Sequence, residues 1–311
     1  MKWKPFFTWK GWLLWSNHFY GICGALLAME TTLTITHTMP SLYLLIFIYA
    51  TILFYYSYAY LKESKIEAYQ ETKQTIYNER VHWYLNARPY LIARQWLIAF
   101  LLLYLSLYAL HFLQLIYSFN IAEIIVVASI VVIILLYDFP QNNVFKQLQI
   151  RRLGFLKSIS ISWVWVFICC CLPLMVANKQ GLVHLSNSNY IIYLFQQFIF
   201  ILILAILFDI KDINKDADEF VKTIVVRYGV RNTIFRIVMP LLVLYVWLSM
   251  YLFFRLHPSF IYLFFPYLIA VLIIVVIYSI QKRKEIHDNI FLIDGLMILK
   301  ACIGILLAAY F

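Results

Sequence analysis

Long apolar runs separated by short polar connections dominate the chain. The stretch YIIYLFQQFIFILILAIL at 190–207 contains no charged residue. A helix needs about 20 mostly apolar residues to cross the hydrocarbon core of a membrane. On that basis the pattern predicts an all-α bundle of nine transmembrane helices. The predicted spans are 11–34, 41–60, 90–113, 120–137, 156–177, 189–208, 235–255, 259–280 and 290–311.

Composition supports the membrane assignment. Hydrophobic residues make up 64% of the chain and charged residues 13%, and the mean hydropathy is +0.82. Soluble globular proteins have charged residues at about a quarter of their positions. These values exclude a soluble globular protein and indicate an integral membrane protein.

Basic residues are distributed very unevenly among the connections. Twenty Lys and Arg residues precede the first span or follow even-numbered spans, whereas two, Lys179 and Arg255, lie in the opposite connections. The positive-inside rule then predicts a cytoplasmic N-terminus and a C-terminus outside, and we expect a bacterial inner membrane. The net charge of +10 belongs to one face, where we expect it to attract anionic lipid and no nucleic acid.

The three long connections are 61–89, 138–155 and 209–234, and all are predicted to be cytoplasmic. Together they would form a polar cap over the bundle, with the functional site beneath it. The sequence shows no internal repeat and no low-complexity linker. We therefore expect residues 1–311 to form a single transmembrane domain.

An acidic run begins where the sixth predicted span ends. In DIKDINKDADEF, Asp209, Asp212 and Asp216 are spaced three and four apart, so on a continuing helix they share one face. Carboxylate oxygens in that pattern suit Mg²⁺, which is commonly held by one or two carboxylates together with substrate phosphates. The run predicts a magnesium–diphosphate site; the alternative is a helix that ends in solvated acids.

Other polar residues lie inside the predicted spans. Glu30, Asp294 and Lys300 are costly in lipid, so we expect them to face the interior, where they line a pocket or pair with one another. We expect Gln196 and Gln197 to make hydrogen bonds between helices.

Two stretches resemble the UbiA superfamily of intramembrane prenyltransferases. DIKDINKDADEFVKTIVVRYG resembles the family's second aspartate-rich motif, and YDFPQNNVFKQLQIRRLGFLKSISISWVW resembles its link between helices four and five. The resemblance implies a nine-helix fold in which the three aspartates hold Mg²⁺ against an isoprenoid diphosphate. It further implies substrate-binding roles for Lys222, Tyr137, Arg151 and Arg152. Asn17, near the start of helix one, and Asp294, near the start of the last span, are two more candidates for substrate contact.

The first motif of that family, N-D-x-x-D-x-x-x-D, is missing. The corresponding stretch reads LFYYSYAYLKESKIEAYQETK, with Ser57 near the Asn position and no Asp. Glu63, Glu67 and Glu71 follow at helical spacing and are either replacement ligands or a solvated face paired with the interleaved lysines.

The leading hypothesis is therefore a Mg²⁺-dependent enzyme that transfers a polyprenyl group from its diphosphate to an aromatic or other lipophilic acceptor. The alternative is a non-catalytic UbiA-like membrane protein that binds an isoprenoid or lipid, or serves as an assembly partner. A CDP-alcohol phosphotransferase is disfavoured because its D-G-x-x-A-R pattern is absent from the acidic run.

Overall fold

The computed structural model describes residues 11–69, 78–112, 120–137, 154–183, 188–218, 221–256, 261–282 and 286–310. Every regular element within these ranges is helical. The long helices are α1 (His18–Thr36), α2 (Leu42–Tyr69), α3 (Asn78–Phe112), α4 (Ile121–Tyr137), α5 (Phe155–Val166), α7 (Ser188–Lys211), α11 (Met239–Leu256), α12 (Ile261–Lys282) and α13 (Ile286–Tyr310). Shorter ones are α6 (Leu172–Lys179), α8 (Ile213–Asp218), α9 (Ile224–Tyr228) and α10 (Val230–Thr233).

Seven of the helical stretches among the described residues are long and apolar enough to cross a membrane. They are His18–Thr36, Leu42–Lys62, Trp83–Ala109, Phe155–Lys179, Ser188–Lys211, Val230–Arg255 and Phe291–Tyr310. The fourth and eighth predicted spans coincide with the shorter apolar stretches Glu123–Ile134 and Phe264–Ile280. The prediction of an all-helical membrane protein is confirmed, and the count of nine crossings stays a prediction.

The predicted connections contain more helix than the hydropathy pattern indicated. Helix α2 continues to Tyr69 and α3 begins at Asn78, so most of 61–89 is helical. Polar side chains in these turns do not prevent helix formation, because helix propensity depends little on hydropathy. Residues 138–153 lie outside the described ranges, and 209–234 contains the end of α7 and helices α8 to α10.

Two spans contain a π-helical turn, and each turn precedes a proline. The turn η5 (Phe167–Cys171) ends two residues before Pro173, and η6 (Ile234–Val238) ends two residues before Pro240. A proline removes one backbone donor and crowds the carbonyl four residues earlier. A wider turn relieves this crowding, which accounts for the position of both π turns.

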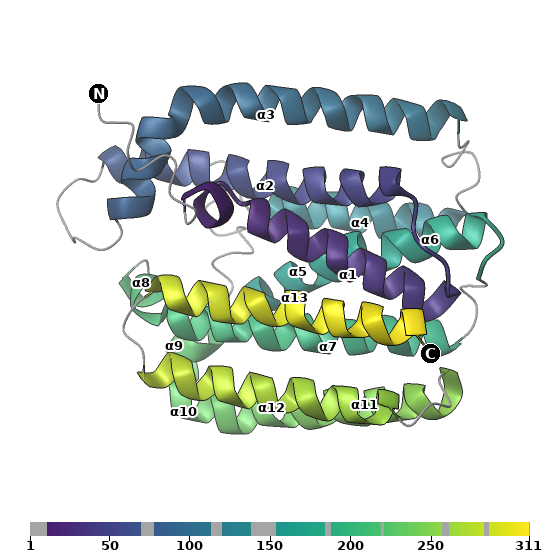
Figure 1. The fold of residues 1–311 in the computed structure, drawn as a ribbon. Helices are drawn as coiled ribbons and strands as arrows, with labels where there is room; N and C mark the ends of the chain where they lie inside the picture. The colour runs from purple at the N-terminus through teal and green to yellow at the C-terminus, as the bar shows by residue number, and fades with distance from the viewer. Residues whose placement is uncertain are drawn as a thin grey trace. The chain divides into compact units, whose positions relative to one another are not determined.

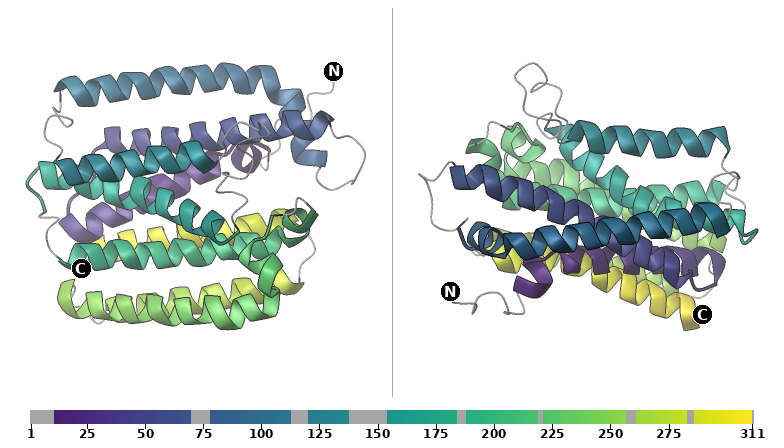
Figure 2. Two further views of the ribbon diagram at one scale, coloured as in Figure 1. Left: turned by 180° about the vertical axis from the view of Figure 1, so that it is seen from behind. Right: turned by 90° about the horizontal axis from the view of Figure 1, so that it is seen from above.

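The described chain divides into two compact units. The first contains Met1–Ala28 and Pro40–Tyr117, and the second contains Met29–Met39 and Ser118–Phe311, so α1 begins in one and ends in the other. In the first unit α2 and α3 run side by side (Figures 1 and 2). Gly21 lets α1 approach α2, because a Cβ there would lie 2.7 Å from the Tyr49 ring.

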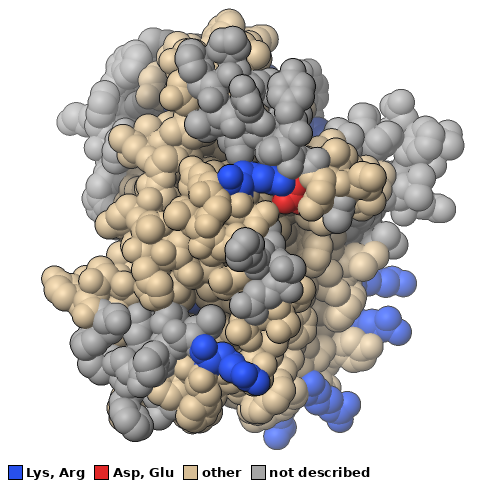
Figure 3. All heavy atoms as spheres, turned by 90° about the vertical axis from the view of Figure 1, so that its right-hand side faces the viewer, with Lys and Arg blue, Asp and Glu red and all other residues tan. Residues whose placement is uncertain are grey.

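Helix α7 is the centre of the second unit. It packs against α5, α11 and α13, while α12 packs against α11 and α13 (Figure 1). From Ile199 to Leu207 every residue of α7 is buried. Among the described atoms of the face drawn in Figure 3, most are neither basic nor acidic, and one basic group lies directly against the acidic group. The second unit thus brings the end of α7, with its aspartates, beside the start of α5.

Candidate functional site

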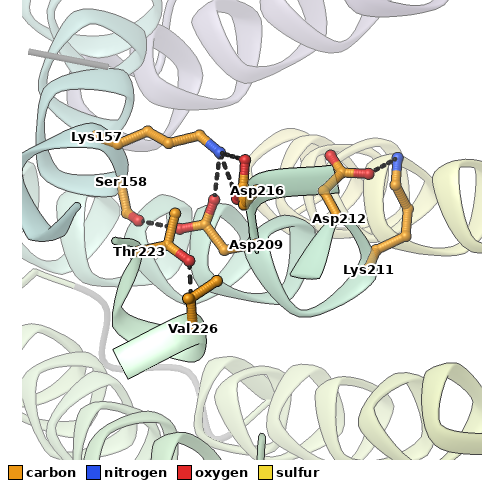
Figure 4. A network of polar contacts seen from close by, with 8 residues as sticks. All are labelled: Lys157, Ser158, Asp209, Lys211, Asp212, Asp216, Thr223 and Val226. Atoms are coloured by element: carbon orange, nitrogen blue, oxygen red, sulfur yellow. Dashed lines mark hydrogen bonds and ion pairs between the residues drawn. The ribbon is translucent and has the colours of Figure 1, made fainter. Parts of the chain in front are cut away.

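A buried ion-pair cluster lies where α7 ends. The ammonium of Lys157, on α5, is 3.0 Å from Asp209 Oδ1 and 2.9 Å from Asp216 Oδ2. Ser158 donates a hydrogen bond to Asp209 Oδ2 at 2.6 Å (Figure 4). Asp209 and Asp216 are 3% and 4% exposed. We call Lys157, Ser158, Asp209 and Asp216 the Asp209 cluster.

Helical hydrogen bonding aligns its two carboxylates. Asp212 N donates to Phe208 O at 3.0 Å, and Asp216 N donates to Asp212 O at 2.9 Å, so the helical rise continues from α7 into α8. Asp209 and Asp216 are seven residues apart, about two helical turns, and therefore face the same side. Lys157 binds both of them from α5.

Asp212 is turned away from this cluster. Its Oδ1 lies 3.4 Å from the ammonium of Lys211, and its side chain is 33% exposed (Figure 4). The structure therefore brings two of the three predicted aspartates together and places the third beside another lysine.

The backbone around Lys222 closes the cluster from the other side. Val221 N donates to Asp216 O at 2.8 Å, and Thr223 caps α9 by accepting from Val226 N at 3.3 Å (Figure 4). Gly154 has φ of +45°, and a Cβ there would lie 1.7 Å from the carbonyl oxygen of Lys222. This close approach of the Gly154 and Lys222 backbones fixes the start of α5, and hence Lys157, against the segment before α9. The Lys222 side chain itself is exposed.

The remaining predicted site residues are distributed as follows. Tyr137, at the end of α4, lies close enough to Lys157 to interact with its charge. Asp294 is 1% exposed on α13, and the contacts described for Asp209 and Asp216 do not include it. Arg151 and Arg152 lie outside the described residues. Lys157 was missed by the sequence reasoning, although it belongs to the basic stretch after Tyr137.

The fit of the cluster to Mg²⁺ can be judged from its donors and charge. Carboxylate oxygens are the ligands that Mg²⁺ prefers, and two carboxylates with one ammonium leave a net charge of about −1 in a buried place. Among the described residues, however, no group of three His, Cys, Asp or Glu side chains is arranged to hold a metal. Lys157 occupies the point between the two carboxylates. Donor type and charge fit a divalent cation, and the magnesium site stays a prediction.

The chain matches no protein-family model, no curated protein and no solved structure.

A second polar cluster lies in the first unit and includes Ser57 of α2. Arg94 Nη2 on α3 donates to Ser57 Oγ on α2 at 2.7 Å. Asn17 Nδ2 donates to Ser57 Oγ at 3.3 Å and to Tyr84 Oη at 2.7 Å. We call these four residues the Arg94 cluster. Sequence reasoning identified Asn17 and Ser57 but missed Arg94, whose only signal is a charge inside an apolar run. The side chains of Glu63, Glu67 and Glu71 lie outside the described residues.

A third polar cluster lies within the spans of the second unit. Lys300 Nζ is 2.6 Å from Glu30 Oε1 and donates to Gln197 Oε1 at 2.7 Å. Gly304 leaves space for the Glu30 side chain, because a Cβ there would lie 2.6 Å from Glu30 Oε1. Gln196 Nε2 donates to Ser249 Oγ on α11 at 2.6 Å. Glu30 and Lys300 pair with each other, which is one of the two roles expected of the charged residues inside the spans, and the expected interhelical bonds of both glutamines are confirmed. These groups border a cavity of about 60 Å³.

Proposed function

We propose that the protein is an intramembrane transferase that moves a polyprenyl group from its diphosphate to an aromatic or other lipophilic acceptor. The observation that carries this proposal is the Asp209 cluster. A lysine and two carboxylates are buried together at the end of apolar helices, at 2.9 to 3.1 Å from one another's charged atoms. Buried charges of this kind in membrane helices mark substrate or ion sites. The substrate class, an isoprenoid diphosphate, is inferred from the resemblance of the surrounding sequence to the UbiA motif.

The chemistry requires charge stabilisation where the diphosphate leaves. Breaking the allylic C–O bond places negative charge on the departing diphosphate and positive charge on the prenyl carbon. Lys157 is positioned to offset the charge on the diphosphate, and Asp209 and Asp216 hold its ammonium in place. Tyr137 lies close enough to Lys157 to interact with its charge. Mg²⁺, when bound to Asp209 and Asp216, would supply further positive charge to the leaving group.

The nine-span topology belongs to this proposal. Helices α4 and α12 would complete nine crossings, with the N-terminus in the cytoplasm and the C-terminus outside. Residues 1–311 would then act as one transmembrane domain of a bacterial inner membrane. By the positive-inside rule, the basic connections would put the Asp209 cluster on the cytoplasmic side, where a soluble diphosphate would be released after transfer.

A second candidate is a non-catalytic protein that binds an isoprenoid or lipid, or that serves as an assembly partner. Ser57 stands where the family has a metal-binding motif, and it is bonded to Arg94 and not to a carboxylate. Lys157 already offsets one negative charge of the second motif. Both features reduce the capacity of these two clusters to bind a metal ion. They are compatible with a protein that binds an isoprenoid without transferring it.

Diphosphate release tests the proposal. Purified protein in phospholipid nanodiscs is incubated with geranyl, farnesyl or longer diphosphates, candidate acceptors and Mg²⁺. We expect release by the wild type and its loss in Lys157→Met and Asp209→Asn. Lys179→Met is a matched control, because Lys179 pairs with Glu123 at 2.9 Å, away from the Asp209 cluster. If the wild type binds diphosphate but never releases it, the non-catalytic alternative holds.

A further inference from the structure

The Arg94 guanidinium is a buried cation that lacks a carboxylate partner among the described residues. Arg94 is 8% exposed, and it lies inside the candidate span Trp83–Ala109. Its Nη2 bonds to Ser57, whereas its Nε and Nη1 are buried without a hydrogen-bond partner. The side chains that interact with its charge are Tyr49, Tyr84, Tyr90 and His18. A charge is costly at this depth unless a counter-ion balances it.

The hydroxyl hydrogen of the neighbouring Ser57 is used by neither of the two hydrogen bonds that its oxygen accepts. Its oxygen accepts hydrogen bonds from Arg94 and from Asn17, and the residue is fully buried. A serine hydroxyl carries one hydrogen in addition to its acceptor lone pairs. Because both contacts use the oxygen as acceptor, this hydrogen is not spent on either. The Arg94 cluster therefore offers unused N–H and O–H donors and a net positive charge.

Three of the four residues lie near the ends of candidate spans, which is where lipid phosphates are found in a membrane. Asn17 directly precedes the span His18–Thr36, and Ser57 lies five residues before Lys62, the end of the span Leu42–Lys62. Five residues of helix correspond to about 7.5 Å. Tyr84 is the second residue of its span and donates to Trp15 O at 2.7 Å. Asn17, Ser57 and Tyr84 are thus near the polar ends of their spans, whereas Arg94 lies eleven residues after the start of Trp83–Ala109 and reaches Ser57 through its long side chain.

The local backbone holds the donors in position at some cost. Asn17 is a non-glycine residue with φ of +66°, in the left-handed region. That conformation directs its amide to both Ser57 and Tyr84. The amide keeps the Ser57 oxygen occupied, so that the hydroxyl hydrogen is left for another acceptor.

We propose that Arg94 and Ser57 form a metal-independent binding site for a phosphate group. Guanidinium groups match phosphate oxygens in geometry and charge, and a tetrahedral phosphate can accept donors that converge from different helices. The phosphate belongs either to a lipid headgroup or to a free phosphate compound. The site rests on the first unit alone and does not depend on the transferase activity proposed for the Asp209 cluster.

Melting in metal-free solution tests this site. The full-length protein in maltoside detergent with EDTA is titrated with sodium diphosphate, or with phosphatidic acid in mixed micelles, against sodium chloride at equal ionic strength. We expect a saturable rise in melting temperature, because a ligand that binds the folded state stabilises it. A rise with diphosphate alone assigns a free phosphate, a rise with phosphatidic acid alone assigns a headgroup, and a rise with both supports the shared chemistry.

Variants show whether the cluster is responsible. We expect Arg94→Met to weaken phosphate binding by about tenfold to a hundredfold, since a hydrogen bond to a charged group is lost. Ser57→Ala should weaken it less, and Arg94→Lys should restore part of it. The exposed Arg236→Met should bind like the wild type.

The ligand-free protein separates binding from a purely structural role. Arg94→Met removes a buried cation without a carboxylate partner, so it should melt at the wild-type temperature or above. Failure of both phosphate compounds to raise the wild-type melting temperature would overturn the proposal. Equal affinity in the wild type and Arg94→Met would do so as well.

Discussion

Lys157 balances the charge of two buried carboxylates. Its ammonium contacts Asp209 and Asp216, and its side chain is 12% exposed. Removing one partner of a buried ion-pair network is expensive, because the groups left behind stay desolvated and uncompensated. Here the removal of the lysine would leave two like charges near each other.

Lys157→Met should therefore lower the free energy of unfolding by about 3 to 5 kcal/mol. Thermal melting in detergent measures the change. Lys179→Met breaks a pair of the same length but should cost less, because it leaves one uncompensated carboxylate, Glu123, instead of two near each other. Adding Asp216→Asn to Lys157→Met should recover part of the loss, as a double-mutant cycle would show. Equal losses in the two lysine variants would refute this account of the cluster.

Metal binding is a separate question at the same residues. If Asp209 and Asp216 hold Mg²⁺ with a diphosphate, the two added together should raise the melting temperature more than diphosphate does in EDTA. Asp209→Asn should abolish this additional rise. The three-carboxylate hypothesis requires Asp212→Asn to abolish it too, whereas Asp212 is turned toward Lys211. Retention of the rise in Asp212→Asn would assign the metal to the other two aspartates.

At the scale of elements, the start of α5 sets the position of Lys157. Gly154 has a positive φ and lies close to the Lys222 carbonyl. The connections 138–155 and 209–234 therefore meet where α5 begins. Glycine is the residue that fits both the backbone conformation and the close approach. The contact couples the ion-pair cluster to the segment before α9.

Gly154→Ala should destabilise the protein by about 3 kcal/mol or more, since strain in the left-handed region adds to a steric clash. Gly181 and Gly229 also have positive φ, at +74° and +76°, but a Cβ there would meet no atom within 4 Å. Alanine at either position should cost about 1 kcal/mol, from backbone strain alone. Thermal melting of the three variants measures the difference. Similar losses at all three positions would mean that the Lys222 contact does not constrain α5.

The sequence was informative about some elements and not about others. Helix positions follow from local hydropathy, so each predicted span overlaps a helix. The acidic run could also be recognised from the local sequence. Its partner was not, because Lys157 and Asp216 are 59 residues apart and only packing of α5 on α7 brings them together. The rotation of Asp212 toward Lys211 likewise depends on where α7 ends and α8 begins, which spacing alone does not determine.

At the scale of the whole molecule, the number of crossings decides on which side of the membrane each cluster lies. Helix α4 has 17 residues, or about 25 Å, which is short for a hydrocarbon core of about 30 Å. Helix α12 has 22 residues, long enough to cross. If both cross, the Asp209 cluster is cytoplasmic. If α4 alone does not cross, every segment after residue 137 changes side, and the basic residues of the later connections would violate the positive-inside rule.

Reporter fusions distinguish these topologies. With nine crossings and a cytoplasmic N-terminus, fusions after residues 75, 148, 220 and 284 should report cytoplasm, and one after residue 184 should report the outside. If neither α4 nor α12 crosses, the reports at 148, 184 and 220 all reverse, while the one at 75 does not. If α12 alone fails to cross, only the report at 284 reverses among these five. We expect the nine-crossing pattern, because it keeps the twenty basic residues of the connections on one side. A cytoplasmic report at 184 would contradict it and would place the Asp209 cluster on the outer face, away from any cytoplasmic supply of diphosphate.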